Sequence, residues 1–220
     1  MRTGHTPNPF QGAIGRTYRE STPDWPAPAQ AEPEAPNIVF VVLDDVGFSD
    51  LGGYGSEIST PTMDALASGG FRYNNFHVTA MCSPTRACLL SGRNAHAVGV
   101  GIIAEFSNGY PGYEGRVSRQ AATIPELLRD RGYGTCAVGK WHLTNLDHCG
   151  AAGPFDDWPL GRGFNHWYGF HGGLTNHWDP ELYHDNGSIK LRLTQVSQLS
   201  ALFPISSSAN PHRCWVLFQK

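Results

Sequence analysis

Residues 38–45 read IVFVVLDD, a run of six apolar residues followed by two aspartates. The apolar part, Ile38–Leu43, has no polar residue at alternate positions. A continuous run of this kind is typical of a strand that is buried on both faces, as in a parallel sheet covered by helices. Two carboxylates, Asp44 and Asp45, are therefore expected at the carboxyl end of a buried strand.

Proline and glycine indicate where helices begin and end farther along the chain. The predicted helices span 60–70, 83–92 and 123–132, and they begin at Thr60-Pro61, Ser83-Pro84 and Thr123. Serine or threonine as N-cap, proline in the first turn and glycine after the last turn are usual helix boundaries, and Ser83 is the expected N-cap of the second helix. Residues 133–138 predict a second short buried strand, followed by Gly139–His142. This order predicts an α/β fold with a largely parallel, mixed sheet flanked by helices.

Composition divides the chain into three parts. Residues 1–36 are rich in proline and small polar residues, which predicts an extended arm lying over the domain. Residues 37–186 contain the predicted α/β domain, and the aromatic-rich stretch 150–186 is interpreted as loops packed around an opening. Residues 187–220 form a divergent tail rich in Ser, Leu and Gln, for which the pattern predicts no particular structure.

Charge and composition exclude several classes of protein. The net charge is −3, with 16 Lys and Arg against 19 Asp and Glu, so no nucleic-acid partner is expected. No apolar stretch reaches the roughly 18 residues of a membrane span, so no membrane partner is expected. The N-terminus lacks the apolar core of a secretory signal, which predicts a cytoplasmic location. Five cysteines without a CxxC pair favour free thiols.

Polar residues follow both predicted strands. Asp44 and Asp45 end the first strand, and Lys140 and His142 follow the second. Ligands of open α/β sheets bind beyond the carboxyl ends of the strands, so these residues are expected near one another. Adjacent carboxylates repel each other without a cation, and hard oxygen ligands suit Ca²⁺ or Mg²⁺. An Asp-Asp pair is explained equally well as a helix or turn cap exposed to water. The pattern leaves both the cation site and the cap open.

Cys82 lies just before the second predicted helix, where free backbone N–H groups and the helix dipole favour an anion. Arg86, in the first turn, adds a positive charge and is able to bind an anion through two hydrogen bonds. A small buried residue before a helix is the alternative interpretation. A tyrosine-phosphatase loop is excluded, because Cys88 occupies the position where that loop needs an arginine. A cysteine-protease pair of Cys82 and His142 leaves the aspartate pair unexplained.

Two longer stretches carry a resemblance to a known family. Residues 82–92, CSPTRACLLSG, resemble the first signature of the sulfatase family, and residues 132–142, GYGTCAVGKWH, resemble the second. The aspartates at 44–45 and the sequence TPTMDAL at 60–66 fit the same family. The resemblance covers residues 36–186 and is greatest to bacterial arylsulfatases of the alkaline-phosphatase-like superfamily. It implies an alkaline-phosphatase-like fold and the hydrolysis of sulfate monoesters.

The resemblance also implies a chemical role for Cys82. In this family a maturation enzyme oxidises the cysteine to formylglycine, and Pro84 and Arg86 belong to the motif that this partner reads. One hydroxyl of the hydrated aldehyde attacks sulfur, and the second allows sulfate to be expelled as the aldehyde re-forms. Cys82 would thus be the precursor of the nucleophile, and Arg86 would hold the hydrate.

The other site residues follow from the same resemblance. Asp44, Asp45 and the modified Cys82 would ligate Ca²⁺, with Mg²⁺ as an alternative. Lys140 would bridge the hydrate to the sulfate of a small-molecule sulfate ester. His142 would take the proton that lets sulfate leave.

The chain departs from the family pattern after Asn186. The histidine, lysine and acid–amide pair that the family supplies downstream do not occur in this sequence. We therefore expect a truncated or frame-shifted product with impaired activity. Two alternatives stay open: a phosphonate or phosphate monoester hydrolase of the same superfamily, and a non-catalytic remnant that binds a cation or a partner.

Overall fold

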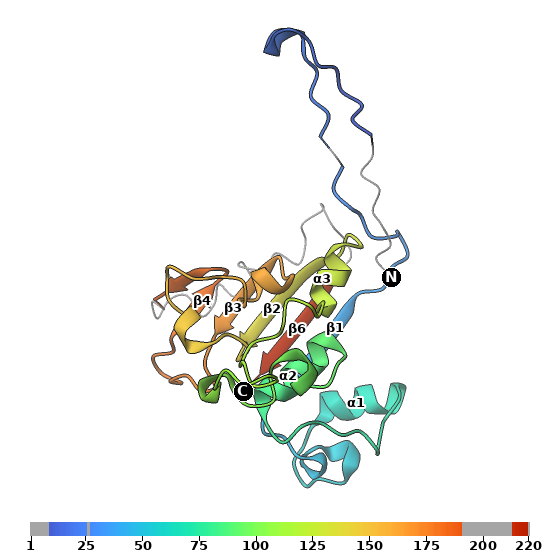
Figure 1. Cartoon of the computed structure of the whole chain (residues 1–220). Coiled ribbons are helices and arrows are strands. Elements are labelled where there is room, and N and C mark those ends of the chain that lie inside the picture. The colour runs from blue at the N-terminus through green and yellow to red at the C-terminus, as the bar shows by residue number, and fades with distance from the viewer. Residues whose placement is uncertain (1–8, 26, 191–212, 220) are drawn as a thin grey trace.

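The computed structural model describes residues 9–25, 27–190 and 213–219, and its centre is a six-stranded sheet (Figure 1). The strands are β1 (Ile38–Leu43), β2 (Gly134–Lys140), β3 (His166–Phe170), β4 (Leu182–His184), β5 (Gly187–Ile189) and β6 (Arg213–Gln219). Their order is β1-β6-β2-β3-β4-β5. The first four strands in this order run parallel, and β4 and β5 add antiparallel pairs. The largely parallel, mixed sheet predicted from the sequence is confirmed.

The prediction that β1 is buried on both faces is wrong. Val39 and Val41 are 56% and 55% exposed, whereas Phe40 and Val42 pack against the main hydrophobic core. The reason is that the described helices pack against only the face of β1 that carries Phe40 and Val42, so the face that carries Val39 and Val41 is uncovered among the described residues. The apolar run therefore marks a strand of a parallel sheet correctly but does not reveal which faces are covered.

Three α-helices were predicted, and all three form. They are α1 (Pro61–Gly69), α2 (Cys82–Ser91) and α3 (Ile124–Arg129), with α2 and α3 lying against the sheet (Figure 1). Thr60 is the N-cap of α1, and Gly92 ends α2 with a left-handed φ of 65°, both as predicted. Within the described residues, no helix has both the length and the apolar character needed to cross a membrane.

The expected start of α2 is wrong by two residues. Met81, not Ser83, is the N-cap, and the backbone N–H of Thr85 donates to the carbonyl oxygen of Met81 at 3.2 Å. The hydroxyl of Ser83 is buried and accepts a hydrogen bond from the backbone N–H of Ala104 at 3.3 Å. Because this tertiary contact uses the Ser83 side chain, Cys82 becomes the first residue of the helix.

The aromatic segment contributes strands as well as loops. β3 and β4 form within residues 150–186, where only loops were expected. Trp158, Phe164 and Trp167 are no more than 1% exposed and fill the main core together with Trp141. An opening of about 360 Å³ lies beside this core, lined in part by His171.

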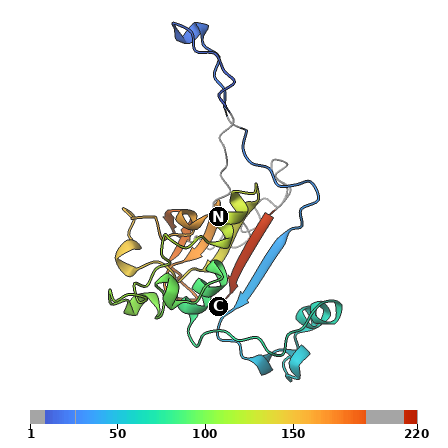
Figure 2. The same ribbon diagram turned by 45° about the vertical axis from the view of Figure 1, so that its right-hand side comes forward.

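The two ends of the chain differ in their relation to the sheet. Residues 9–25 project away from the sheet rather than lying over it (Figures 1 and 2), and Ile14 and Tyr18 are 87% and 93% exposed. Residues 9–25 therefore leave these apolar side chains exposed, whereas Pro28 and Ala29 farther along the arm line a pocket together with Gly132 and Tyr133 of the domain. At the other end, β5 and β6 both come from the tail that had no predicted structure, although 191–212 lie outside the described residues.

Candidate active site

The residues predicted for the site meet where the carboxyl ends of β1 and β2 approach the N-terminus of α2. Asp44 follows β1 directly, and Lys140 is the last residue of β2. Cys82 and Arg86 lie in the first two turns of α2. His142 follows β2 with a left-handed φ of 58°, and its backbone N–H donates to the carbonyl oxygen of His171 at 2.9 Å.

One half of the site is a buried ionic cluster around Asp44. Lys140 Nζ lies 2.7 Å from Asp44 Oδ2, and Arg86 Nη2 lies 3.1 Å from the same oxygen. Arg86 Nη1 also donates to the carbonyl oxygen of Lys140 at 2.5 Å. Burial by itself would raise the pKa of Asp44, but hydrogen bonds and charges from Lys140 and Arg86 outweigh it and lower the pKa. Asp44 is therefore ionised at neutral pH.

The other half of the site is a chain of contacts that begins at Cys82. Cys82 Sγ lies 3.0 Å from His142 Nδ1, and His142 Nε2 lies 2.6 Å from Glu105 Oε2. Burial, and to a lesser extent the charges of Lys140 and Arg86, lower the pKa of His142 against the opposing effect of Glu105. The imidazole is thus held neutral, with Nδ1 facing Cys82.

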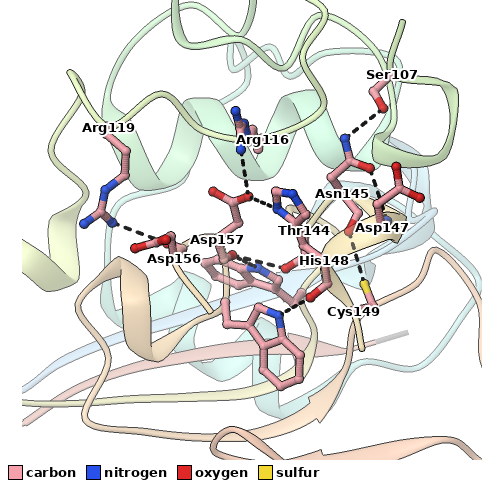
Figure 3. Close-up of polar contacts among 12 residues, drawn as sticks. Ser107, Arg116, Arg119, Thr144, Asn145, Asp147, His148, Cys149, Asp156 and Asp157 are labelled. Atoms are coloured by element: carbon pink, nitrogen blue, oxygen red, sulfur yellow. Dashed lines mark hydrogen bonds and ion pairs between the residues drawn. The ribbon is translucent and has the colours of Figure 1, made fainter. Parts of the chain in front are cut away.

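The network behind these residues anchors the segment that follows β2. The indole N–H of Trp141 and the hydroxyl of Thr144 both donate to the carbonyl oxygen of Asp157, at 2.9 and 3.1 Å. The carboxylate of Asp157 contacts His148 Nδ1 at 2.8 Å and Arg116 Nη1 at 3.7 Å (Figure 3). Because Trp141 lies between Lys140 and His142, this network helps to fix the position of both.

The chemistry of the aspartate pair fits a hard cation. Asp45 is exposed, forms no ion pair within the described part of the chain, and has a φ of 57° that turns it away from the path of β1. Carboxylate oxygens of this kind suit Ca²⁺ or Mg²⁺. Among residues 9–25, 27–190 and 213–219, however, no group of three or more His, Cys, Asp or Glu side chains lies close enough to hold a metal ion. The ligand set of Asp44, Asp45 and Cys82 stays a prediction.

Comparison with known proteins decides the family. A family model described as Sulfatase matches residues 36–210. The chain belongs to the sulfatase family. It is 43% identical over 159 residues to an uncharacterized sulfatase of Schizosaccharomyces pombe, a match that covers 69% of this chain and 27% of the relative. It is 36% identical over 154 residues to the arylsulfatase of Klebsiella aerogenes, covering 69% and 32%. The chain therefore spans about a third or less of these sulfatases.

Solved structures give the same family and fold. The sulfatase fold of this chain superimposes on Ps i-CgsB in complex with k-i-k-neocarrahexaose with a TM-score of 0.68 and 26% identity, covering 84% of this chain and 45% of that one. It also matches BT4656 in complex with its substrate D-glucosamine-2-N,6-O-disulfate, with a TM-score of 0.63 and 28% identity, covering 84% and 34%. The alkaline-phosphatase-like fold implied by the sequence is confirmed.

The structure brings together four of the residues that the sulfatase signatures singled out: Cys82, Arg86, Lys140 and His142. Their catalytic roles stay predictions, as does the role of Asp45 on the exposed side of the site. Glu105, by contrast, was missed by sequence reasoning. It lies in a short 3₁₀ helix at Ala104–Phe106, and a single acidic residue in an otherwise apolar stretch, IIAEF, was its signal.

Proposed function

We propose that this chain carries the nucleophile half of a sulfatase site that hydrolyses sulfate monoesters through a formylglycine made from Cys82. The observation that supports this most directly is the contact of Cys82 Sγ with His142 Nδ1 at 3.0 Å, at the N-terminus of α2. Family membership and the sulfated sugar bound to a structural relative support the class of substrate.

The charges around Cys82 suit an anionic substrate. Arg86, Lys140 and the N-terminal end of α2 each favour a sulfate group there. The carboxylate of Asp44 offsets part of this positive charge. A Ca²⁺ ion, or alternatively Mg²⁺, held by Asp44, Asp45 and the modified residue 82 would restore it and would polarise the sulfate oxygens.

The reaction requires two steps: a displacement at sulfur, and then an elimination at the carbon of residue 82. A hydroxyl of the hydrated aldehyde at residue 82 attacks sulfur and gives up its proton. The bond from sulfur to the alcohol oxygen breaks, and the alcohol leaves with that proton. The second hydroxyl then loses its proton to His142 Nδ1 while the bond from residue 82 carbon to the sulfate oxygen breaks. This step releases sulfate and re-forms the aldehyde, which water hydrates again. A thiol or a simple alcohol at residue 82 has no second hydroxyl, so it could not release the sulfate in this way.

The proposed partners follow from this chemistry. The substrate is a small-molecule sulfate ester, and a formylglycine-generating enzyme must act on Cys82 before folding buries the first turns of α2. The predicted cytoplasmic location stays a prediction.

Peptide mass spectrometry tests the modification directly. The chain is expressed with and without a formylglycine-generating enzyme and is digested with trypsin. Cys82 then lies in the peptide 73–86 and Cys88 in the peptide 87–93, so each cysteine is measured separately. We expect an aldehyde at Cys82 only with the enzyme and an unmodified thiol at Cys88 in both samples. An unmodified thiol at Cys82 after co-expression would contradict the proposal.

A turnover assay tests the reaction. The matured chain and its Cys82→Ala variant are given Ca²⁺ and an activated aryl sulfate, with the corresponding aryl phosphate in parallel. We expect sulfate release that depends on Cys82 and exceeds phosphate release. Equal release by the Cys82→Ala variant would refute the proposal, and faster phosphate release would favour the phosphate monoester hydrolase instead.

A further inference from the structure

We propose that Glu105 is a positioning residue that fixes the orientation and tautomer of His142, so that Nδ1 presents a lone pair to the nucleophile at residue 82. This inference rests on the proposed function for its catalytic meaning, but its geometry is independent of it. Glu105 Oε2 lies 2.6 Å from His142 Nε2, on the side of the ring opposite to the contact with Cys82 Sγ.

Glu105 is itself held from two sides. Its second carboxylate oxygen, Oε1, accepts a hydrogen bond from the backbone N–H of Gly173 at 2.9 Å. The preceding residue, Ala104, is 1% exposed and donates its backbone N–H to Ser83 Oγ on α2. The carboxylate is thus fixed relative to both the helix that carries Cys82 and the segment that follows β3.

The imidazole has little room to take another orientation. A Cβ atom added at Gly173 would lie 2.9 Å from His142 Cε1 and 3.1 Å from Nε2, so glycine is needed for the ring to pack this closely. The backbone N–H of His142 is bound to the carbonyl oxygen of His171. Because backbone and ring are both confined, the contact with Glu105 decides which edge of the ring faces residue 82.

The tautomer follows from what each atom is able to donate. An ionised carboxylate only accepts hydrogen bonds, so the contact with Glu105 requires a proton on His142 Nε2. Burial would raise the pKa of Glu105, but hydrogen bonds from His142 and Gly173 lower it, which keeps the carboxylate ionised. A neutral imidazole carries one N–H, so Nδ1 is left as the acceptor facing Cys82. A hydroxyl or thiol at residue 82 can then donate its proton to Nδ1.

Glu105→Gln separates this role from mere space filling. Both carboxylate oxygens of Glu105 accept hydrogen bonds, whereas an amide of the same shape has one acceptor and one donor. The backbone N–H of Gly173 can only donate, whereas a neutral imidazole can change its tautomer. The amide oxygen of the variant is therefore expected to face Gly173 and its NH₂ group to face His142 Nε2, which favours the opposite tautomer with the proton on Nδ1. Glu105→Asp retains the carboxylate on a shorter side chain, and Glu57→Gln makes the same chemical change at an exposed position.

Two readouts on the unmodified chain test the proposal without sulfatase activity. Nitrogen-15 spectra of the labelled imidazoles, with His142 assigned by a His142→Gln variant, report the tautomer. The rate at which iodoacetamide alkylates Cys82, with Cys88 in the same sample as reference, reports proton transfer to Nδ1. We expect the Nε2–H tautomer in the wild type and in Glu57→Gln. In Glu105→Gln we expect Nδ1–H and alkylation of Cys82 slowed roughly tenfold or more, with partial recovery in Glu105→Asp.

Failure of this inference is distinct from failure of the proposed function. The Nδ1–H tautomer in the wild type would overturn it whether or not any variant folds. Unchanged tautomer and alkylation rate in a folded Glu105→Gln variant would overturn it as well. Absence of formylglycine at Cys82 would instead refute the proposed function, and it would leave these two measurements on Cys82 and His142 unaffected.

Discussion

The burial of His171 predicts that the folded protein loses stability in mild acid. Substitution of His171 should remove this loss. Its side chain is buried, with ring centroids 4.1 Å from Trp158 and 4.7 Å from both Trp167 and Tyr183. Neither ring nitrogen has a hydrogen-bond partner within the described residues. Burial lowers the pKa of His171 from 6.5 to about 3. The folded protein thus holds a neutral imidazole that the unfolded chain protonates readily.

The sign and size of the effect follow from linkage. Between the unfolded pKa of 6.5 and the folded pKa of about 3, the unfolded state binds more protons at this residue, so stability falls as pH falls. Each pH unit in this window lowers the free energy of unfolding by about 1 kcal/mol, which gives about 2 kcal/mol between pH 7 and pH 5.

The variant His171→Phe keeps an aromatic ring in the cluster but does not titrate. We expect it to be at least as stable as the wild type at pH 7, because two nitrogens without a protein partner are no longer desolvated. Urea unfolding at pH 7 and pH 5 measures the difference, and His177→Phe, a change at an exposed histidine, serves as the control. The same loss of stability on acidification in wild type and His171→Phe would refute the reasoning.

Two further substitutions test the packing around the site. Leu90→Ala on α2 should lower the free energy of unfolding by about 2–5 kcal/mol, because Leu90 is 1% exposed in the main core. Urea unfolding measures this change, and a loss below about 1 kcal/mol would contradict the packing. Gly163→Ala should lower the stability by at least about 1 kcal/mol. Gly163 has a φ of 100°, and an added Cβ would lie 2.3 Å from the backbone nitrogen of Glu126. An unchanged melting temperature for Gly163→Ala would show that this turn rearranges freely.

Local patterns predicted the parts of the site that depend on strand and helix ends. The aspartates after IVFVVL and the residues after β2 lie at the same edge of the sheet because the carboxyl ends of parallel strands meet there. Sequence reasoning missed Glu105, because its partners His142 and Gly173 are distant in the chain and no periodicity links them. It also misplaced the start of α2, because a tertiary contact from Ala104 uses the Ser83 hydroxyl that would otherwise cap the helix.

The exposure of β1 and the strands of the aromatic segment were missed for a different reason. An apolar run indicates residues that prefer burial, but it does not reveal whether another element covers both faces of the strand, and Val39 and Val41 lie on a face that the described residues leave open. β4 in the aromatic segment and β5 in the tail are three residues each, too short for an alternating pattern to be recognised.

The place of β6 in the sheet governs when the site is able to assemble during synthesis. β6 lies between β1, which leads to Asp44, and β2, which ends in Lys140, so these two strands share no hydrogen bond. Their relative position, and with it the Asp44–Lys140 ion pair, is completed by a strand that the ribosome makes after Asp44, Cys82 and Lys140. Such pairing across a long sequence separation has a high contact order, which slows folding. The ribosome will therefore have exposed Cys82 for an interval before the sheet closes around it, and under the proposed function this is the interval in which the formylglycine-generating enzyme would act.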